Sequence, residues 1–361
     1  MSDITNKFCE LIQISLGTKG EFEQMPTEKE WHLLFELASK HSLLGVLLVG
    51  VNKTNVNQEN INQKLLWEWI GVQQMTIATN ERINDRINKL CKHIGGWGYR
   101  GCVLKGQGVA QLYPDPSLRQ SGDIDLWIDG KQDAFLRDVK RNGITIDNID
   151  YVHSGIEFFE DVKVEIHFRP TWMYNPLSNK RLQKYFVNNK CVQFNHYDEN
   201  VSFAYPNIRF NLVYSLIHIN RHIFEEGIGL RQFMDYYYIL KYSTEEDRKD
   251  AIKILTTIKL RKFAGAVMYV LEKVFRLDSD VLLCPVNVSE GEFLLCEILR
   301  GGNFGRYDER NQWFKKGQRL KKNLFTIKRS LRYLIHYPSE VLWIPFWKIW
   351  HYQWRKRKGY L

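Results

Sequence analysis

A change of hydrophobic periodicity along the chain constrains its fold more than any other sequence feature. Residues 1–95 carry apolar side chains at helical spacing, most clearly from Glu28 to His41 and from Gln63 to Ile94. From 96 to 204 short β-type runs alternate with Gly, Pro and Asp, and from 205 onward helical periodicity returns. The sequence therefore predicts an α+β protein, in which a small mixed sheet over 96–204 lies between helical regions over 1–95 and 205–361.

Individual elements follow from the same patterns. Strands are expected at Cys102 to Leu104, at Ile124 to Ile128 and within Ile156 to Phe168. A helix from Lys131 to Asn142 is expected to end at Gly143. In the last region helices are expected over 207–224, 229–242, 245–275, 290–300 and 315–336.

The charge of the chain favours anionic partners. The chain has 51 Lys and Arg against 41 Asp and Glu, and this formal net charge of +10 suits nucleotides, nucleic acid or an acidic membrane surface without choosing among them. The longest apolar run, Leu43 to Val51, is far shorter than the roughly 20 residues of a membrane-spanning helix. Because the first residues lack a secretory-signal pattern and the six cysteines include no C-x-x-C pair, we expect a cytoplasmic protein with reduced thiols.

Two aspartates share one face of the strand expected around residue 124. Side chains alternate along a strand, so Ile124, Leu126 and Ile128 point into a core while Asp123 and Asp125 point the other way. Nothing basic stands between the two carboxylates in the sequence, and such a pair repels unless a cation lies there. Oxygen ligands suit Mg²⁺. The pair therefore predicts a metal site, and the alternative is a solvated strand end.

A third carboxylate lies on a later strand. Residues 162–168 alternate cleanly, which places Lys163, Glu165 and His167 on one face, and residues 155–160 are the expected hairpin partner. If this strand lies beside that of Asp123, Glu165 completes a two-metal site, which holds the attacking and leaving oxygens of an in-line displacement. The alternative is an ordinary exposed carboxylate.

A glycine-rich turn, Lys105-Gly106-Gln107-Gly108, separates an apolar strand from a candidate helix. Glycines let a backbone approach phosphate closely, and a helix N-terminus presents free N–H groups to an anion. The turn does not match the P-loop pattern G-x-x-x-x-G-K-[ST]. It predicts a phosphate contact with Lys105 as an added positive charge, and the alternative is a simple turn.

Together these motifs resemble the nucleotidyltransferase superfamily of polymerase beta, whose pattern is a glycine motif before a helix, an h-D-h-D-h strand and a later carboxylate. The closer resemblance is to a bacterial family of uncharacterised nucleotidyltransferases with a leucine-lysine-glycine turn, a tyrosine-proline-aspartate loop and an arginine before G-D-I-D-L. The matching segments here are Leu104-Lys105-Gly106, Tyr113-Pro114-Asp115, Arg119 and Gly122-Asp123-Ile124-Asp125-Leu126.

The resemblance implies a nucleotidyltransferase that moves an NMP from an NTP to a hydroxyl or amine of a small-molecule or protein acceptor and releases pyrophosphate. It implies that Mg²⁺ or Mn²⁺ is held by Asp123, Asp125 and Glu165. The residues implied in NTP binding are Lys105, Gly106, Gln107, Arg119, Gly122 and Arg231. The usual Gly-Ser or Gly-Gly pair of the superfamily is Gly106-Gln107 here, so the phosphate contact departs from the pattern.

Two pairs of residues in the last region carry competing interpretations. His218 and His222 lie four residues apart, but the glutamate of H-E-x-x-H is missing, so we expect them to pack against the catalytic core or to line the acceptor cleft. Arg231 and Asp235, also four apart, either form an intrahelical ion pair or leave Arg231 free to reach the nucleotide.

The C-terminal end combines tryptophans with a basic run. Trp343, Trp347, Trp350 and Trp354 precede the cations of 355–358, and a second basic cluster lies at 315–322. Such a segment suits contact with an anionic membrane surface or nucleic acid, and the alternative is that the rings dock into the helical region. Pro345 predicts an irregular turn followed by a short helix.

Two further interpretations stand beside the enzyme. On the same fold, the chain could be a non-catalytic basic module that binds nucleic acid or a membrane surface. A regulator that modifies a toxin-like partner protein would use the same transfer chemistry. Three carboxylates placed together favour the enzyme, because like charges are costly to gather without a cation.

Overall fold

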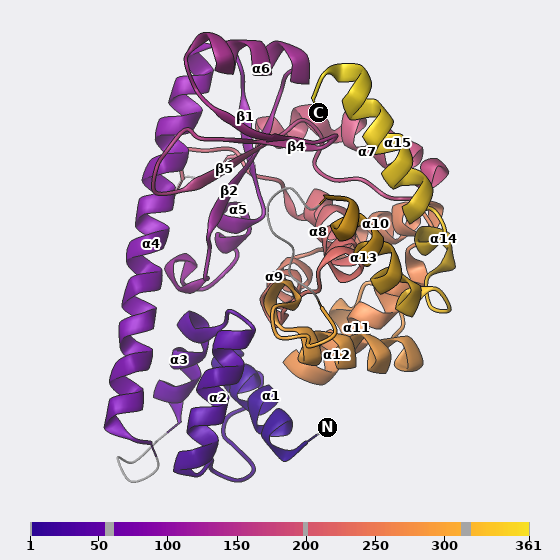
Figure 1. The fold of residues 1–361 in the computed structure, drawn as a ribbon. Coiled ribbons are helices and arrows are strands. Elements are labelled where there is room, and N and C mark those ends of the chain that lie inside the picture. Colours follow the sequence, from indigo (N-terminus) through magenta and orange to yellow (C-terminus); the bar gives the residue numbers. More distant parts are fainter. Residues whose placement is uncertain (1, 55–60, 198–200, 312–318, 361) are drawn as a thin grey trace.

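The computed structural model describes residues 2–54, 61–197, 201–311 and 319–360, and it confirms the α+β fold. A five-stranded mixed sheet lies in the upper half of the molecule in Figure 1, with helices from both ends of the sequence around it. The division of the chain into separate domains at residues 95 and 204 stays a prediction.

Four helices precede the sheet: α1 (Asp3–Leu16), α2 (Glu28–Lys40), α3 (Leu44–Lys53) and α4 (Gln63–Gly96). The two helices predicted here begin at side-chain caps, because Thr27 and Glu30 form a capping box on α2 and Asn62 caps α4. Helix α4 runs along one side of the molecule from the N-terminal helices to the sheet (Figure 1). It therefore joins these two parts as one continuous element.

Strands β1 and β2 are followed, after a helix, by three more strands of the same sheet. Their bounds are β1 (Gly101–Leu104), β2 (Asp123–Ile128), β3 (Ile146–Ile149), β4 (His153–Ile156) and β5 (Lys163–His167), in the order β1-β2-β5-β4-β3. Only β2 and β5 pair in parallel; the other neighbours are antiparallel. The hairpin partner expected at 155–160 is shifted, because β4 ends at Ile156 and the following residues form the connection to β5.

One face of the sheet is covered by α4 and by α6 (Gln132–Arg141). The buried residues on this side are Ile124, Leu126, Val164 and Ile166 of the strands, Ile83, Ile87 and Leu90 of α4, and Phe135 and Val139 of α6. Since side chains alternate along each strand, the opposite face presents Asp123, Asp125 and Glu165 toward the C-terminal helices.

The remaining helices are α5 (Gly106–Ala110), α7 (Pro176–Phe194), α8 (Ile208–Glu225), α9 (Leu230–Lys241), α10 (Glu245–Thr257), α11 (Arg261–Phe275), α12 (Val288–Gly301), α13 (Arg319–Ser330), α14 (Pro338–Val341) and α15 (Ile344–Lys358). The single helix predicted over 245–275 is wrong. Lys259 adopts a left-handed φ of 64°, which ends α10 and turns the chain into α11. Residues 315–318 of the helix expected over 315–336 lie outside the described residues.

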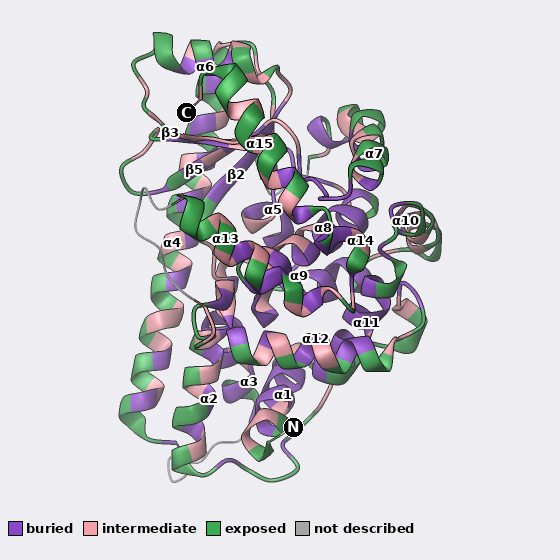
Figure 2. Ribbon diagram, turned by 45° about the vertical axis from the view of Figure 1, so that its right-hand side comes forward, coloured by how far each residue is buried: buried purple, intermediate pink, exposed green. Residues whose placement is uncertain are grey.

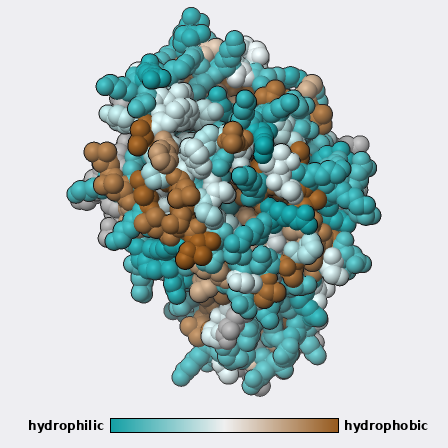
Figure 3. Space-filling model, turned by 90° about the vertical axis from the view of Figure 1, so that its right-hand side faces the viewer, coloured by the Kyte–Doolittle hydropathy of each residue, from teal (hydrophilic) through white to brown (hydrophobic). Residues whose placement is uncertain are grey.

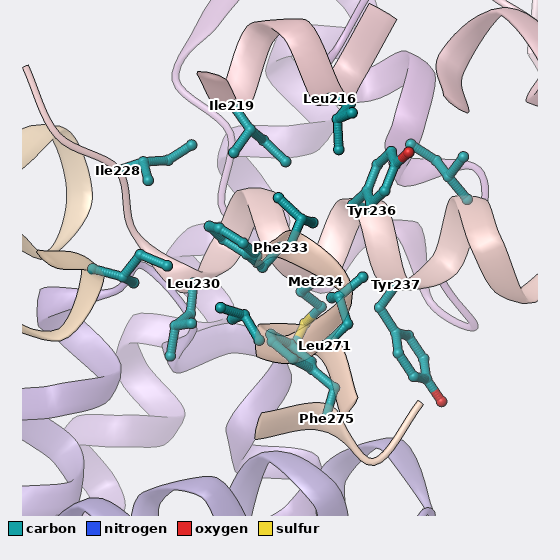
Figure 4. Close-up of a cluster of buried hydrophobic side chains, with 14 of the residues drawn as sticks. Leu216, Ile219, Ile228, Leu230, Phe233, Met234, Tyr236, Tyr237, Leu271 and Phe275 are labelled. Atoms are coloured by element: carbon teal, nitrogen blue, oxygen red, sulfur yellow. The ribbon is translucent and has the colours of Figure 1, made fainter. Parts of the chain in front are cut away.

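Helix α9 lies at the centre of the C-terminal helices. Almost every residue from Leu230 to Leu240 is buried, and Figure 2 shows the same burial along α8 and α9. Phe233 and Met234 of α9 pack with Leu216 and Ile219 of α8 and with Leu271 and Phe275 of α11 (Figure 4). This packing fixes the N-terminal part of α9, where Arg231 and Asp235 project toward the sheet.

Helix α15 joins the C-terminal helices to the sheet. Trp347 is buried and stacks on Trp172 with ring centroids 5.1 Å apart, and Lys358 pairs with Asp133 of α6 at 2.6 Å. The turn predicted at Pro345 lies just before it, at Leu342 and Trp343 between α14 and α15. Pro345 itself lies in the first turn of α15, where a proline lacks only an N–H that would have no helical partner. None of the helices in the described part of the chain has the length and apolar character needed to cross a membrane.

Candidate active site

A cleft of about 710 Å³ separates the open face of the sheet from the helices opposite. The sheet side carries Asp123, Asp125, Glu165 and His167, and helices α8, α9, α13 and α15 supply the other walls. The sequence motifs and the C-terminal helices therefore meet around one cavity.

Two neighbouring parallel strands bring the three predicted carboxylates together. Asp125 of β2 stands opposite Glu165 of β5 in the strand register, and Asp123 lies two residues earlier on the same face. Each residue offers an oxygen that lies within 4.8 Å of the oxygens of the other two. Carboxylate oxygens at this spacing are the ligand type that Mg²⁺ and Mn²⁺ bind, so the donor set fits such a cation.

Glu165 also belongs to a second group, which contains two histidines. His153 of β4 and His167 of β5 each offer a nitrogen within 4.8 Å of the Glu165 oxygen and of one another. His167 Nε2 lies 2.7 Å from Asp125 Oδ1. The sequence pattern placed His167 on the same strand face as Glu165 but assigned it no role. It did not identify His153. The alternation around Glu165 was the only sequence signal for this second group.

Two lysines pair with the carboxylates. Lys105 Nζ lies 2.9 Å from Asp125 Oδ1, and Lys163 Nζ lies 2.5 Å from Glu165 Oε1. Nothing basic stands between the aspartates in the sequence, but Leu104 at the end of β1 is opposite Asp125 in the antiparallel register. This register places Lys105, the next residue, beside Asp125. The aspartates therefore have a positively charged neighbour that the sequence did not reveal.

The electrostatic environments of the two aspartates differ. Burial in the cleft and the charge of Asp125 raise the pKa of Asp123, although its side chain remains accessible to solvent in the cleft. Burial opposes ionisation of Asp125 as well, but Lys105 and His167 outweigh it and hold the pKa of Asp125 well below its usual range. Asp125 is therefore firmly ionised, whereas Asp123 is the carboxylate whose charge a cation would stabilise.

The glycine-rich turn has a left-handed backbone. Lys105 and Gly106 have φ angles of 52° and 34°, and α5 starts directly after Lys105. A Cβ on Gly108 would lie 2.5 Å from the carbonyl oxygen of Val103, so a glycine is required for α5 to pack this closely on β1. Lys105 and Gly106 line the cleft, as the resemblance implied.

Gln107 supports this turn from inside the protein. Its side chain is buried, donates to Asn84 Oδ1 at 2.9 Å and accepts from the Ser121 hydroxyl at 2.8 Å. The side chain is therefore committed to internal hydrogen bonds. A nucleotide contact by Gln107 is left to its backbone.

Arg119 is also committed inside the protein. Its Nε and Nη2 donate to the two carboxylate oxygens of Asp235 at 2.7 Å each, and Tyr113 donates to the same carboxylate at 2.7 Å. All three side chains are buried. The intrahelical Arg231–Asp235 pair considered from the sequence does not form among the described residues, because Asp235 turns to Arg119. The ion pair between Arg119 and Asp235 therefore connects the loop before β2 to α9.

Arg231 reaches the same loop from α9. Its Nη1 donates to the carbonyl oxygen of Gln120 at 2.6 Å, and its Nε has no hydrogen-bond partner in the described part of the chain. Burial and the neighbouring Arg119 lower the pKa of Arg231 to about 10. Gly122 lies two residues after Gln120 in the same loop. A Cβ built on Gly122 would have no atom within 4 Å, so there is open space beside it. An anionic ligand beside Gly122 would compensate the buried charge of Arg231.

His218 and His222 of α8 line the far wall of the cleft. Their ring centroids are 4.3 Å apart. Burial lowers the pKa of His222 to about 3 and that of His218 well below its usual value, so both rings are neutral at pH 7. Neither belongs to a metal-binding group among the described residues.

The fold and the cleft agree with a comparison to protein families. A family model described as an uncharacterised nucleotidyltransferase matches residues 27–276, which include the glycine-rich turn, the three carboxylates and α9. Among curated proteins no sequence gives a significant match. Because the family model covers well over half of the chain, the protein belongs to this nucleotidyltransferase family.

Proposed function

We propose that this protein is a metal-dependent nucleotidyltransferase that moves an NMP from an NTP to a hydroxyl or amine of an acceptor and releases pyrophosphate. The observation that carries the proposal is the convergence of Asp123, Asp125 and Glu165 on one face of the cleft. Family membership supports nucleotidyl transfer in general. The metal dependence and the NTP are supported by the chemistry of the carboxylates and of the neighbouring cations.

The three carboxylates would bind the cation together. Asp123, Asp125 and Glu165 would hold Mg²⁺ or Mn²⁺, which supplies neutralisation of charge on the transferring phosphoryl group. Lys105 competes with that cation for Asp125, and once released its ammonium group is placed to contact a phosphate. Glu165 is placed to take the proton of the attacking hydroxyl or amine.

The nucleotide side of the cleft lies at β1, β2 and α9. Lys105, Gly106, Gly122 and Arg231 line it and would bind the triphosphate. Arg119 and Gln107 act behind this surface, since they hold the loop and the turn in place through Asp235, Ser121 and Asn84. Positioning of this kind is a large part of catalysis in phosphoryl transfer.

The proposal is tested by incubating the protein with mixed NTPs, candidate acceptors and Mg²⁺, and by measuring mass increments with mass spectrometry. The expected result is an increment of one NMP on an acceptor or on the protein itself, with release of pyrophosphate, and loss of both with EDTA. Transfer that persists after complete removal of divalent cations would contradict the metal-dependent mechanism.

Replacement of Lys105 by Met is expected to have opposite effects on two ligands. The KM for NTP should rise about ten-fold or more, because a charged phosphate contact is lost. The affinity for Mn²⁺ should increase, because the ammonium group that competes for Asp125 is gone. Steady-state kinetics and Mn²⁺ titration followed by electron paramagnetic resonance would measure the two effects.

The matched control for this variant is Lys92→Met, at an exposed position on α4 outside the cleft. It should change neither the KM for NTP nor the affinity for Mn²⁺. An unchanged KM in Lys105→Met would show that Lys105 only stabilises the turn.

Attachment to an anionic membrane surface is a second candidate function. Helices α13 to α15 and the turns between them expose large apolar side chains: Leu320, Leu324, Leu331, Ile335, Leu342, Trp343, Phe346, Ile349, Trp350 and Tyr352. Figure 3 shows apolar side chains gathered on the side of the molecule where these helices lie. Apolar patches of this extent are uncommon on monomeric proteins. The exposed cations Lys356 and Arg357 follow these residues on α15 and complement anionic headgroups.

Membrane attachment predicts that the wild-type protein sediments with phosphatidylserine vesicles at low salt and is released as salt is raised. The double variant Phe346→Asp with Ile349→Asp should lose this binding, since both side chains are exposed on α15 and their replacement does not disturb the core. Val187→Asp, at an exposed apolar position on α7, is the matched control and should bind normally. No wild-type binding at low salt would refute the hypothesis.

A further inference from the structure

The wall of the cleft formed by α13 and α15 carries two lysines that are not neutralised by an ion pair. Lys322 of α13 and Lys348 of α15 both line the cavity. Within the part of the chain that the structure describes, neither has a carboxylate within 4 Å. Lys348 lies partly buried, and burial lowers its pKa despite two carboxylates in its surroundings. The ring of Trp347, whose centroid lies 5.7 Å from the Lys348 ammonium, offsets part of its charge. A partly buried ammonium group without a carboxylate partner is costly, and an anionic ligand would remove that cost.

The acidic groups around Lys348 are already paired with other residues. Glu225 of α8 accepts from Arg221 at 3.1 Å and from the Tyr174 hydroxyl at 2.6 Å. Asp150, after β3, lies 3.1 Å from His351. Lys322 and Arg221 add further positive charge near Lys348. Glu226, which lies near Lys322, and Arg355 of α15 also line the cleft. Among the described residues, these four cations therefore face three carboxylates at this end, so positive charge is in local excess.

Lys348 lies on the opposite side of the carboxylates from the nucleotide contacts. Asp150 interacts with His153, and His153 Nε2 lies 3.5 Å from Glu165 Oε2, so Lys348 stands on the β4 and β5 side of the site. Lys105 and Arg231 stand on the β1 and β2 side. An NTP bound on the β1 and β2 side therefore leaves the β4 and β5 side of the cleft to the acceptor.

The position of this wall in the sequence sets it apart from the rest of the site. The nucleotidyltransferase family model ends at residue 276, whereas α13 and α15 follow it in the chain. The carboxylates and the nucleotide contacts all lie inside the matched range. The lysine-bearing wall therefore lies outside the range that the family model matches.

We propose that Lys348, together with Lys322, binds an oxyanion group of the acceptor, so that the acceptor of this enzyme is a phosphorylated or otherwise anionic molecule. The name acceptor rests on the proposed function, but the anion site itself does not. A lysine ammonium binds phosphate as a point charge, and a site with two lysines attracts a group with more than one negative charge.

The anion site is tested by chemical labelling of the intact protein. Acetic anhydride modifies unprotonated amines, and peptide mapping by mass spectrometry reports the labelling rate of each lysine. Inorganic phosphate should slow the labelling of Lys348 several-fold relative to chloride at equal ionic strength. It should leave Lys92, which is exposed on α4 outside the cleft, unchanged. Equal labelling of Lys348 in phosphate and chloride would overturn the proposal.

Two further arms separate the proposal from its alternatives. Protection of Lys348 by an NTP alone, at concentrations that saturate the nucleotide site, would assign this lysine to the triphosphate and overturn the acceptor assignment. Once an acceptor is found, Lys348→Met should raise its KM about ten-fold without changing the KM for NTP, and Lys92→Met should change neither. An unchanged acceptor KM would also overturn the proposal.

The labelling result does not depend on catalysis. Phosphate protection without any detectable transfer would support the anion site while contradicting the proposed nucleotidyltransferase activity. Transfer without phosphate protection of Lys348 would support the nucleotidyltransferase activity and contradict the anion site.

Discussion

Replacement of Asp123 by Asn is expected to lower nucleotidyl transfer by at least roughly 10²-fold, because a cation that loses one carboxylate ligand stabilises the transition state less by several kcal/mol. The fold should be retained. Asp123 forms no ion pair among the described residues, and its side chain is open to the cleft. The variant also removes repulsion with Asp125, so its melting temperature should not fall. A transfer assay and circular dichroism on the same preparation measure both quantities.

The matched control for Asp123→Asn is Glu157→Gln. Glu157 is an exposed carboxylate that directly follows β4 and does not line the cleft. Its replacement should leave the transfer rate unchanged. Full activity of Asp123→Asn would end the two-metal hypothesis, whatever the behaviour of the control.

The largest effect on stability is expected from Asp235→Ala. This change leaves the guanidinium of Arg119 buried without its carboxylate and removes the acceptor of the Tyr113 hydroxyl. Breaking a buried pair by removing one partner typically lowers the free energy of unfolding by about 3–5 kcal/mol. Thermal unfolding should therefore show a clear drop in melting temperature.

Two comparisons define this stability prediction. Asp85→Ala removes an exposed carboxylate that pairs with Arg86 and Lys89, and it should leave the melting temperature nearly unchanged. The double variant Arg119→Met with Asp235→Leu should recover part of the stability, because no unpaired charge remains. Equal melting temperatures for Asp235→Ala and Asp85→Ala would show that the buried pair is energetically unimportant.

Much of the carboxylate cluster could be predicted because it depends on strand alternation. Apolar residues at every second position of β2 and β5 determine which face is buried, so Asp123, Asp125 and Glu165 had to share the other face once the two strands were neighbours. The starts of α2 and α4 were predictable for a similar local reason, since capping residues precede them. Local patterns report local geometry.

The contacts between distant segments could not be predicted in this way. The pair of Arg119 and Asp235 spans 116 residues and exists because α9 packs against the loop before β2. Lys105 meets Asp125 only because β1 is the antiparallel neighbour of β2. Helix α7 was also missed, since only a few of its residues, such as Leu182 and Phe186, are buried and they give no clear helical stripe. The break between α10 and α11 at Lys259 could not be predicted because no Gly or Pro stands there in the sequence.

The buried pair of Arg119 and Asp235 also restricts how the cleft can move. A hinge that swung the sheet away from α9 would have to separate two buried charges, and breaking a buried ion pair is costly. The two walls on the nucleotide side therefore behave as one rigid body. Entry and exit of substrates then depend on motion at the opposite side. There α15 contacts α6 through the ion pair of Lys358 with Asp133, and it contacts Tyr151, between β3 and β4, through Trp350 and Trp354. The rigid side is preorganised, and under the proposed function any induced fit accompanies binding of the acceptor.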